Sequence, residues 1–307
     1  MFSSFMPTRV STLPTLFGEK VVVRVLDARQ AQLQLAALGY EPADRMQLEQ
    51  AIRRPHGMVL VTGPTGSGKT QSLYACLNEL NTQEVNIATV EDPCEIQMSG
   101  INQVNVQDKP GLTFAVALRA FLRQDPDILM VGEIRDLETA QIAIQASQTG
   151  HLVLSTLHTN DAMGTLVRLR NMGVAPYNIA ASVSLVTAQR LVRRLCMHCR
   201  QPHTLSPEAL RQAGWEGECD DPSLRSVYRS VGCAHCHKGF QGRTGIFQVM
   251  PVSAAMQALI LQEAGLQALA QQTRAEGITT LRQAGLRKVL AGVTSLDEVL
   301  SATQEPT

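Results

Sequence analysis

Short apolar runs alternate with longer amphipathic segments in the first half of the chain. Residues 58–61, 86–90, 127–132 and 152–156 are short and almost wholly apolar, which is typical of buried strands. Between them, 113–123 and 137–148 carry apolar residues at helical spacing, with Thr113 as a helix cap and Pro126 as a stop. Residues 101–106 alternate like an edge strand. Strands that alternate with helices predict an α/β fold with a parallel sheet covered on both faces.

The flanking regions have different patterns. Residues 19–26 are β-rich and 29–54 read as connecting helices, whereas the chain is helical again from Val252 onward. Residues 191–250 are rich in turns and cysteine. We therefore expect four parts: an N-terminal remnant and linker over 1–54, a nucleotide-binding core over 55–190, a cysteine module over 191–250, and a helical region over 251–307.

The run 58–61 ends in a glycine-rich loop that fits G-x-x-x-x-G-K-[ST] at every fixed position. Glycines allow consecutive backbone N–H groups to point at phosphate oxygens, and the helix that follows adds its positive dipole end. Strand, loop and helix in this order predict a phosphate site, with Lys69 on the β- and γ-phosphates and Thr70 on Mg²⁺. The predicted nucleotide-binding residues are Gly63, Pro64, Thr65, Gly66, Ser67, Gly68, Lys69 and Thr70.

Carboxylates follow two of the predicted strands. Glu133 ends an apolar strand, a position from which it can orient or deprotonate the attacking water, because active groups gather at the carboxyl ends of such strands. Glu91, Asp92 and Glu95 end another strand and are candidates to hold Mg²⁺ or its waters. The alternative for each is a solvated loop carboxylate.

Two arginines and two histidines are weaker candidates. Arg119 and Arg123 share one helix face and directly precede the Glu133 strand, so they are either surface charges or phosphate contacts. His151 and His158 flank the strand 152–156. Either histidine could be structural, but the polar cluster around His158 at the strand's end suits a group that senses the γ-phosphate.

Two C-x₂-C pairs stand in the cysteine module. Cys196, Cys199, Cys233 and Cys236 supply four thiolates for tetrahedral Zn²⁺, although the pairs are farther apart than is common. Such a closed set predicts a structural metal, and four unrelated free cysteines are the alternative.

Composition narrows the function classes. Lys+Arg and Asp+Glu number 27 each and aromatics make up 4%, which argues against a nucleic-acid surface. No apolar run approaches the ~20 residues that span a bilayer, and the N-terminus does not resemble a signal peptide. We therefore expect a cytoplasmic protein without a transmembrane segment, whose seven cysteines are free or metal-bound.

Together, these stretches resemble the secretion ATPase family of type II secretion and type IV pilus assembly. The resemblance rests on RVSTLPT at 9–15, GEK at 18–20, the phosphate loop (Walker A), EDPCE at 91–95 (Asp box), 118–136 (Walker B), 149–160 (His box), the two C-x₂-C pairs and GRTGIF at 242–247. It implies a RecA-like P-loop NTPase core with ATP and Mg²⁺ at the subunit interfaces of a hexamer, and Glu133 as the catalytic carboxylate.

The resemblance also implies roles beyond the core. Arg9 and Arg24 would act as arginine fingers, joined by Arg119 and Arg123. The zinc module resembles that of the assembly branch, which implies secretion or extension rather than retraction. The implied partners are the inner-membrane platform and cytoplasmic-ring proteins of the machine, where the protein would dock.

One departure leaves alternatives open. Family members carry a larger N-terminal region, and here the chain begins almost at Arg9, so we expect a fragment or a truncated paralogue. Two other functions therefore stay open beside the motor ATPase: a nucleotide-binding assembly subunit that does not hydrolyse ATP, and a nucleic-acid translocase.

Overall fold

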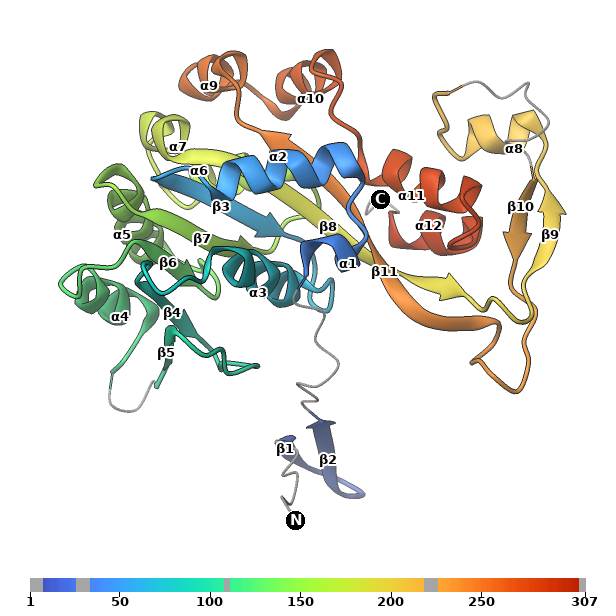
Figure 1. Cartoon of the computed structure of the whole chain (residues 1–307), viewed down its shortest axis with the longest axis horizontal. Coiled ribbons are helices and arrows are strands. Elements are labelled where there is room, and N and C mark those ends of the chain that lie inside the picture. The colour runs from blue at the N-terminus through green and yellow to red at the C-terminus, as the bar shows by residue number, and fades with distance from the viewer. Residues whose placement is uncertain (1–7, 26–33, 108–110, 218–225, 304–307) are drawn as a thin grey trace.

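The computed structural model describes residues 8–25, 34–107, 111–217 and 226–303. Its centre is a seven-stranded sheet with the order β11-β8-β3-β7-β6-β4-β5 (Figure 1). The strands are β3 (Gly57–Thr62), β4 (Ile87–Glu91), β5 (Ile101–Asn105), β6 (Ile128–Val131), β7 (Leu152–Leu157), β8 (Val183–Leu195) and β11 (Phe240–Pro251). All neighbours pair in parallel except β11, which runs antiparallel to β8 at one edge. This confirms the predicted α/β fold with a mostly parallel sheet.

Alternate residues of the buried strands face two separate layers of helices. Met58 and Leu60 of β3 point into one layer, and Val59 and Val61 into the other. The first layer contains α4 (Phe114–Phe121), α5 (Leu137–Gln148), α6 (Ala162–Asn171), α7 (Pro176–Ser182), α9 (Ala254–Leu261) and α10 (Leu266–Ala275). The second contains α1 (Leu35–Leu38), α2 (Pro42–Ile52) and α3 (Lys69–Leu80). Because helices cover both faces of the sheet, a functional site is expected at the carboxyl ends of its strands.

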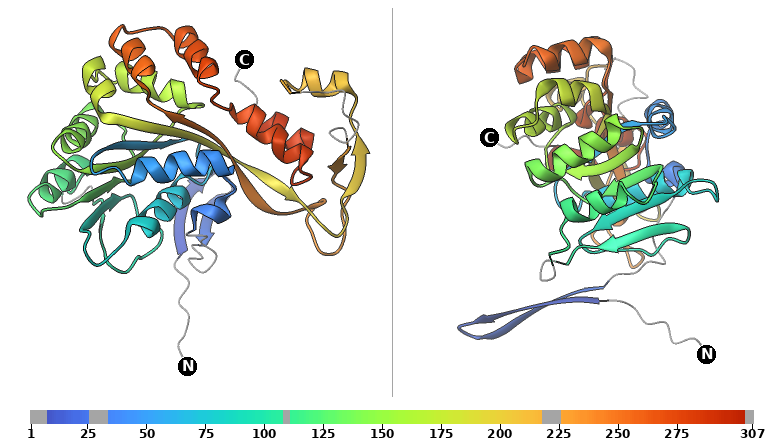
Figure 2. Two further views of the ribbon diagram at one scale, coloured as in Figure 1. Left: turned by 45° about the horizontal axis from the view of Figure 1, so that its top comes forward. Right: turned by 90° about the vertical axis from the view of Figure 1, so that its left-hand side faces the viewer.

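Strands β8 and β11 form a long antiparallel ribbon that extends beyond the core, as Figures 1 and 2 show. At its far end lie β9 (Gln201–Thr204), β10 (Ser226–Arg229) and α8 (Pro207–Gln212). The boundaries that we expected at 190/191 and 250/251 fall inside β8 and β11. The cysteine module is therefore carried on two strands of the central sheet.

The C-terminal helices divide between the two regions. Helices α9 and α10 cover the core, whereas α11 (Leu281–Leu290) and α12 (Leu296–Ala302) pack beside the ribbon. Leu286, Val289 and Val299 of these last helices share a small apolar cluster with Leu210 of α8 and Val227 of β10. The module thus has a core of its own, to which the end of the chain contributes.

The hairpin of β1 (Thr8–Thr15) and β2 (Gly18–Val25) lies apart from the sheet (Figure 2). Its register sets Arg9 opposite Arg24, but the side chains of these two residues lie outside the described part of the structure. Among the helices of the described residues, none has the length and apolar character needed to cross a bilayer.

Candidate functional site

The phosphate loop follows β3 and leads directly into α3. Gly63 has φ 151°, and a Cβ there would stand 2.5 Å from the carbonyl oxygen of Gln189 and 2.6 Å from Ser67 Oγ, so only glycine fits. Gly68 occupies the helix N-cap with φ 87°. Lys69 Nζ donates to the carbonyl oxygens of Gly63 at 2.8 Å and Pro64 at 3.1 Å, so its ammonium lies within the loop that carries the phosphate motif.

A buried glutamine of the neighbouring strand supports this loop from below. Gln189 of β8 donates from Nε2 to the carbonyl oxygen of Ser67 at 2.7 Å. Its Oε1 accepts from the hydroxyl of Ser72 on α3 at 2.8 Å. Because Gln189 is 2% exposed, both bonds form away from water and fix the loop against the sheet.

The side chains at the ends of β6 and β7 meet the lysine. His158 lies with Nδ1 3.5 Å from Lys69 Nζ and with Nε2 3.3 Å from Glu133 Oε2. Since an ammonium can only donate, these contacts favour the histidine tautomer with the proton on Nε2, which donates to Glu133. Arg135 donates to the other oxygen of Glu133 and lies 3.7 Å from Asp92 Oδ2. Residues from three strand ends therefore form one polar chain.

The charges in this chain shift two pKa values. Burial lowers the pKa of Lys69, while the charge of Glu133 opposes that shift and Arg190 adds to it. Burial by itself would raise the pKa of Glu133, but the hydrogen bond and charge of Arg135, together with His158, outweigh it and hold that pKa below its ordinary value. Glu133 is therefore ionised near neutral pH and able to accept a proton.

Lys69, Glu133 and His158 line a cavity of about 580 Å³ at the carboxyl edge of the sheet. Its wall includes most residues of the phosphate loop and of the acidic turn after β4, together with Glu133 and His158. Within the acidic turn, Glu91 is 3% exposed and accepts from Thr89 at 2.7 Å, whereas Asp92 and Glu95 are the more accessible carboxylates. The size and polarity of the cavity suit a nucleotide phosphate group with a hydrated cation.

Three of the weaker candidates lie elsewhere. His151 precedes β7 at the amino edge of the sheet, where its Nδ1 lies 2.9 Å from the carbonyl oxygen of Ala146. Within this chain it lies outside the wall of that cavity, so a catalytic role for His151 stays a prediction. Arg119 of α4 pairs with Glu138 at 2.7 Å, and Arg123, in the turn after that helix, donates to the carbonyl oxygen of Arg119 at 2.8 Å. Both arginines are exposed and lie outside the cavity wall. A role for these two arginines requires a neighbouring subunit.

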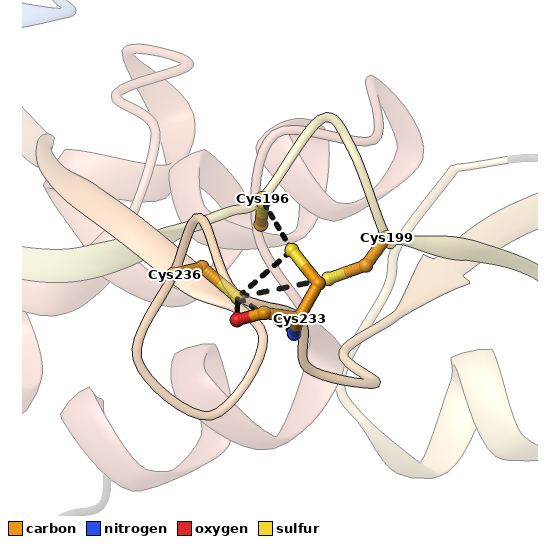
Figure 3. A group of neighbouring side chains, drawn as sticks. All are labelled: Cys196, Cys199, Cys233 and Cys236. Carbon is orange, nitrogen blue, oxygen red and sulfur yellow. Dashed lines mark hydrogen bonds between the residues drawn. The ribbon is translucent and has the colours of Figure 1, made fainter.

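The four predicted cysteines converge at the far end of the ribbon (Figure 3). Cys196 Sγ lies 3.9 Å from Cys233 Sγ, and Cys236 Sγ lies 3.7 Å from the sulfurs of Cys199 and Cys233. Zinc–sulfur bonds of ~2.3 Å in a tetrahedron would set the sulfurs about 3.8 Å apart. The cluster therefore fits a Cys₄ zinc site, and these separations exclude disulfide bonds among the four.

Backbone N–H groups also point at these sulfurs. Gly232 donates to Cys199 Sγ at 3.4 Å and Cys233 donates to Cys236 Sγ at 3.3 Å. Such donors stabilise thiolate charge and orient the ligands. Cys76 and Cys94 are free thiols away from the cluster, and Cys219 lies outside the described residues.

Several residues at the site were not identified from the sequence. Gln189 of β8, and Tyr74 of α3, whose hydroxyl donates to Glu91, reach it through the packing of these elements, for which the sequence holds no local signal. Arg135 was also missed, although it stands two positions after Glu133 in a loop that the strand pattern places at the carboxyl edge.

Comparison with known proteins gives consistent matches over nearly the whole chain. The sequence model of the family described as "Type II/IV secretion system protein" matches residues 3–301. The type IV pilus assembly ATPase PilB of Acinetobacter baylyi is 54% identical over 297 residues, which cover 97% of this chain and 51% of that protein. The type II secretion system ATPase E of Vibrio cholerae is 51% identical over 298 residues, covering 97% and 58%. The chain thus spans about half the length of the curated relatives that it matches.

Solved structures agree on the fold. The pilus retraction motor PilT with bound ADP superposes with a TM-score of 0.69 at 24% identity, covering 97% of this chain and 78% of that one. The Legionella pneumophila ATPase DotB gives a TM-score of 0.67 at 20% identity, covering 95% and 71%. At these identities, the likeness shows a shared fold.

Proposed function

The chain belongs to the type II/IV secretion system protein family, and we propose that it binds ATP in the cavity at the carboxyl edge of its sheet and hydrolyses it to ADP and phosphate. The observation that carries this proposal is the polar chain from Lys69 through His158 to Glu133. It sets a cation for the phosphates next to a carboxylate with a lowered pKa, in a cavity walled by a phosphate loop.

The roles of the residues follow from their chemistry. Backbone N–H groups of the loop and the ammonium of Lys69 bind the β- and γ-phosphates, for which Lys69 exchanges its present bonds to loop carbonyls. Mg²⁺, held through Thr70 and the waters that Asp92 and Glu95 bind, would neutralise charge that develops on the phosphates.

Glu133 orients the attacking water and accepts its proton. The Nε2–H of His158 and the guanidinium of Arg135 bond to its two oxygens and fix the direction of the carboxylate. When a γ-phosphate binds Lys69, the contact between Lys69 and His158 is lost and the His158 ring can change its orientation. Because the ring also bonds to Glu133, nucleotide binding is coupled to the position of that carboxylate.

We further propose that the site is completed at a subunit interface. No arginine belongs to the cavity wall formed by the described residues, although phosphoryl transfer gains from an arginine that neutralises the transition state. Arg9, Arg24, Arg119 and Arg123 of an adjacent subunit in a hexamer are the candidates. The motion of such a hexamer would act on the platform and ring proteins of a type IV pilus or type II secretion machine, a proposal supported by the names of the relatives.

Steady-state ATP hydrolysis with Mg²⁺ tests the proposal. The wild-type chain is expected to turn over ATP, and Lys69→Ala to lose both turnover and ATP binding, because the ammonium is the main cation for the phosphates. Nucleotide binding by the wild type without any turnover would instead support an assembly subunit that does not hydrolyse ATP. If neither binding nor turnover occurs, the proposal fails altogether.

A further inference from the structure

A buried tyrosine links the phosphate-binding helix to the acidic turn. Tyr74 lies in the second turn of α3 and is fully buried. Its hydroxyl donates to the carboxylate of Glu91 and accepts the backbone N–H of Glu95 at 3.1 Å. A weaker contact to the N–H of Ile96 measures 3.4 Å. This single hydroxyl group therefore bonds to Glu91 at the start of the acidic turn 91–95 and to Glu95 at its end.

The edge strand supplies a second support for the same turn. Gln103 of β5 donates from Nε2 to Glu91 Oε1 at 3.3 Å and to the carbonyl oxygen of Ile96 at 2.9 Å. Its Oε1 accepts the N–H of Met98 at 2.7 Å. The turn is thus restrained by Gln103 of β5 on one side and by Tyr74 of α3 on the other. Of these two elements, α3 is the one that begins at the phosphate loop.

The bonds to Glu91 divide the carboxylates of the turn into two kinds. Glu91 is buried and accepts from the side chains of Thr89, Tyr74 and Gln103, so its oxygens are directed at the protein. Asp92 and Glu95 are more accessible and belong to the cavity wall. Burial, followed by the hydrogen bond and charge of Glu91, holds the pKa of Tyr74 well above its ordinary value, so the phenol keeps its proton and remains a donor.

We infer that Tyr74 is a positioning residue of the site: its hydroxyl fixes the acidic turn relative to the phosphate-binding helix, so that Asp92 and Glu95 face the phosphates and the cation. The inference rests on the proposed ATPase function for its catalytic consequence. Helix α3 starts at Lys69 and carries Tyr74, so one rigid element sets both the phosphate position and the carboxylate position. A misplacement of ~1 Å at such a site can lower the rate about a hundredfold.

Replacement of Tyr74 by phenylalanine tests this, because the ring still fills its buried space. For Tyr74→Phe we expect kcat to fall about tenfold and the Mg²⁺ concentration for half-maximal rate to rise several-fold, while KM for ATP stays within about twofold. Tyr228→Phe removes the same group in the cysteine module and is expected to match the wild type in all three quantities. If KM for ATP rises in Tyr74→Phe by as much as kcat falls, and the melting temperature is lower, the variant has lost structure generally and the inference is overturned.

A second readout does not depend on hydrolysis. Cys94 lies inside the turn, where its Sγ accepts from Gln103 Nε2 at 3.0 Å. The alkylation rate of Cys94 by iodoacetamide, followed by peptide mass spectrometry, is expected to rise several-fold in Tyr74→Phe and to stay unchanged in Tyr228→Phe.

The two readouts separate the two possible failures. If the wild type hydrolyses ATP and Tyr74→Phe equals it in kcat and Mg²⁺ dependence, the inference fails and the proposed function stands. If the wild type does not hydrolyse ATP, the proposed function fails. The labelling then decides whether Tyr74 fixes the turn, and equal rates for Cys94 in both proteins overturn it.

Discussion

The bond from β8 to the phosphate loop gives a quantitative prediction. Gln189→Leu keeps a similar volume but removes both side-chain bonds, and it leaves the carbonyl oxygen of Ser67 and the hydroxyl of Ser72 buried without these partners. Each buried polar group that loses its partner costs about 1–3 kcal/mol. For the two groups together, we therefore expect the free energy of unfolding to fall by about 2–6 kcal/mol, as measured by urea denaturation at pH 7.

The same change should weaken nucleotide binding. Because Gln189 holds the loop at Ser67, its loss lets the loop adopt other conformations, and we expect the Kd for ATP to rise about tenfold, equivalent to ~1.4 kcal/mol. Gln148→Leu is the matched control, since Gln148 is exposed on α5 and makes one side-chain bond, to Asn178. A loss of stability below about 0.5 kcal/mol in Gln189→Leu, equal to that of the control, would show that these two bonds do not stabilise the loop.

Three further predictions concern the charges, the metal and the subunit interface. For Arg135→Gln, the acid limb of kcat/KM should move to higher pH. Because Arg135 lowers the pKa of Glu133, the wild type keeps this carboxylate ionised to a lower pH than the variant does. An acid limb at the same pH in both proteins would contradict this. Metal analysis should find one Zn²⁺ per chain in the wild type and in Cys94→Ser. Cys196→Ser should lose the Zn²⁺ and melt several degrees lower. A wild-type protein without metal would contradict the proposed role of the cluster. Finally, mixing the inactive variants Lys69→Ala and Arg24→Ala should restore part of the ATPase activity if arginines act on the neighbouring site, whereas no recovery would place Arg24 elsewhere.

The sequence predicted the elements that are defined by local pattern. The apolar run 58–61 became β3, and the predicted helix 137–148 matches α5 at both ends, because cap and periodicity act over a few residues. The ribbon of β8 and β11 was missed. Its register joins Leu195 to Phe240 across the whole cysteine module, and the outer part of β8 carries exposed arginines that do not read as a buried strand.

The residues of the candidate site also fall into those with a local sequence signal and those without one. The phosphate loop, Glu133 and the cysteine pairs are marked by residue type and spacing, so the sequence alone predicts them as candidates. Gln189 and Tyr74 are ordinary buried residues by sequence, and only the order of the strands brings their polar atoms to the loop and the acidic turn. His151 was predicted to act with the catalytic residues because it adjoins β7. It precedes the start of that strand, at the edge of the parallel sheet opposite the phosphate loop, so its catalytic role stays a prediction.

We propose that Glu133 drives hydrolysis of the ATP held by the phosphate loop. The most direct measurement is the identity of the bound nucleotide, with the turnover rate, after incubation of Glu133→Gln with Mg²⁺ and ATP. The control is Glu84→Gln, an exposed residue of the loop between α3 and β4. We predict that Glu133→Gln retains intact ATP and turns over at least ~100-fold more slowly than the wild type, while Glu84→Gln yields ADP at the wild-type rate. Hydrolysis by Glu133→Gln at the wild-type rate would show that Glu133 is not the catalytic carboxylate.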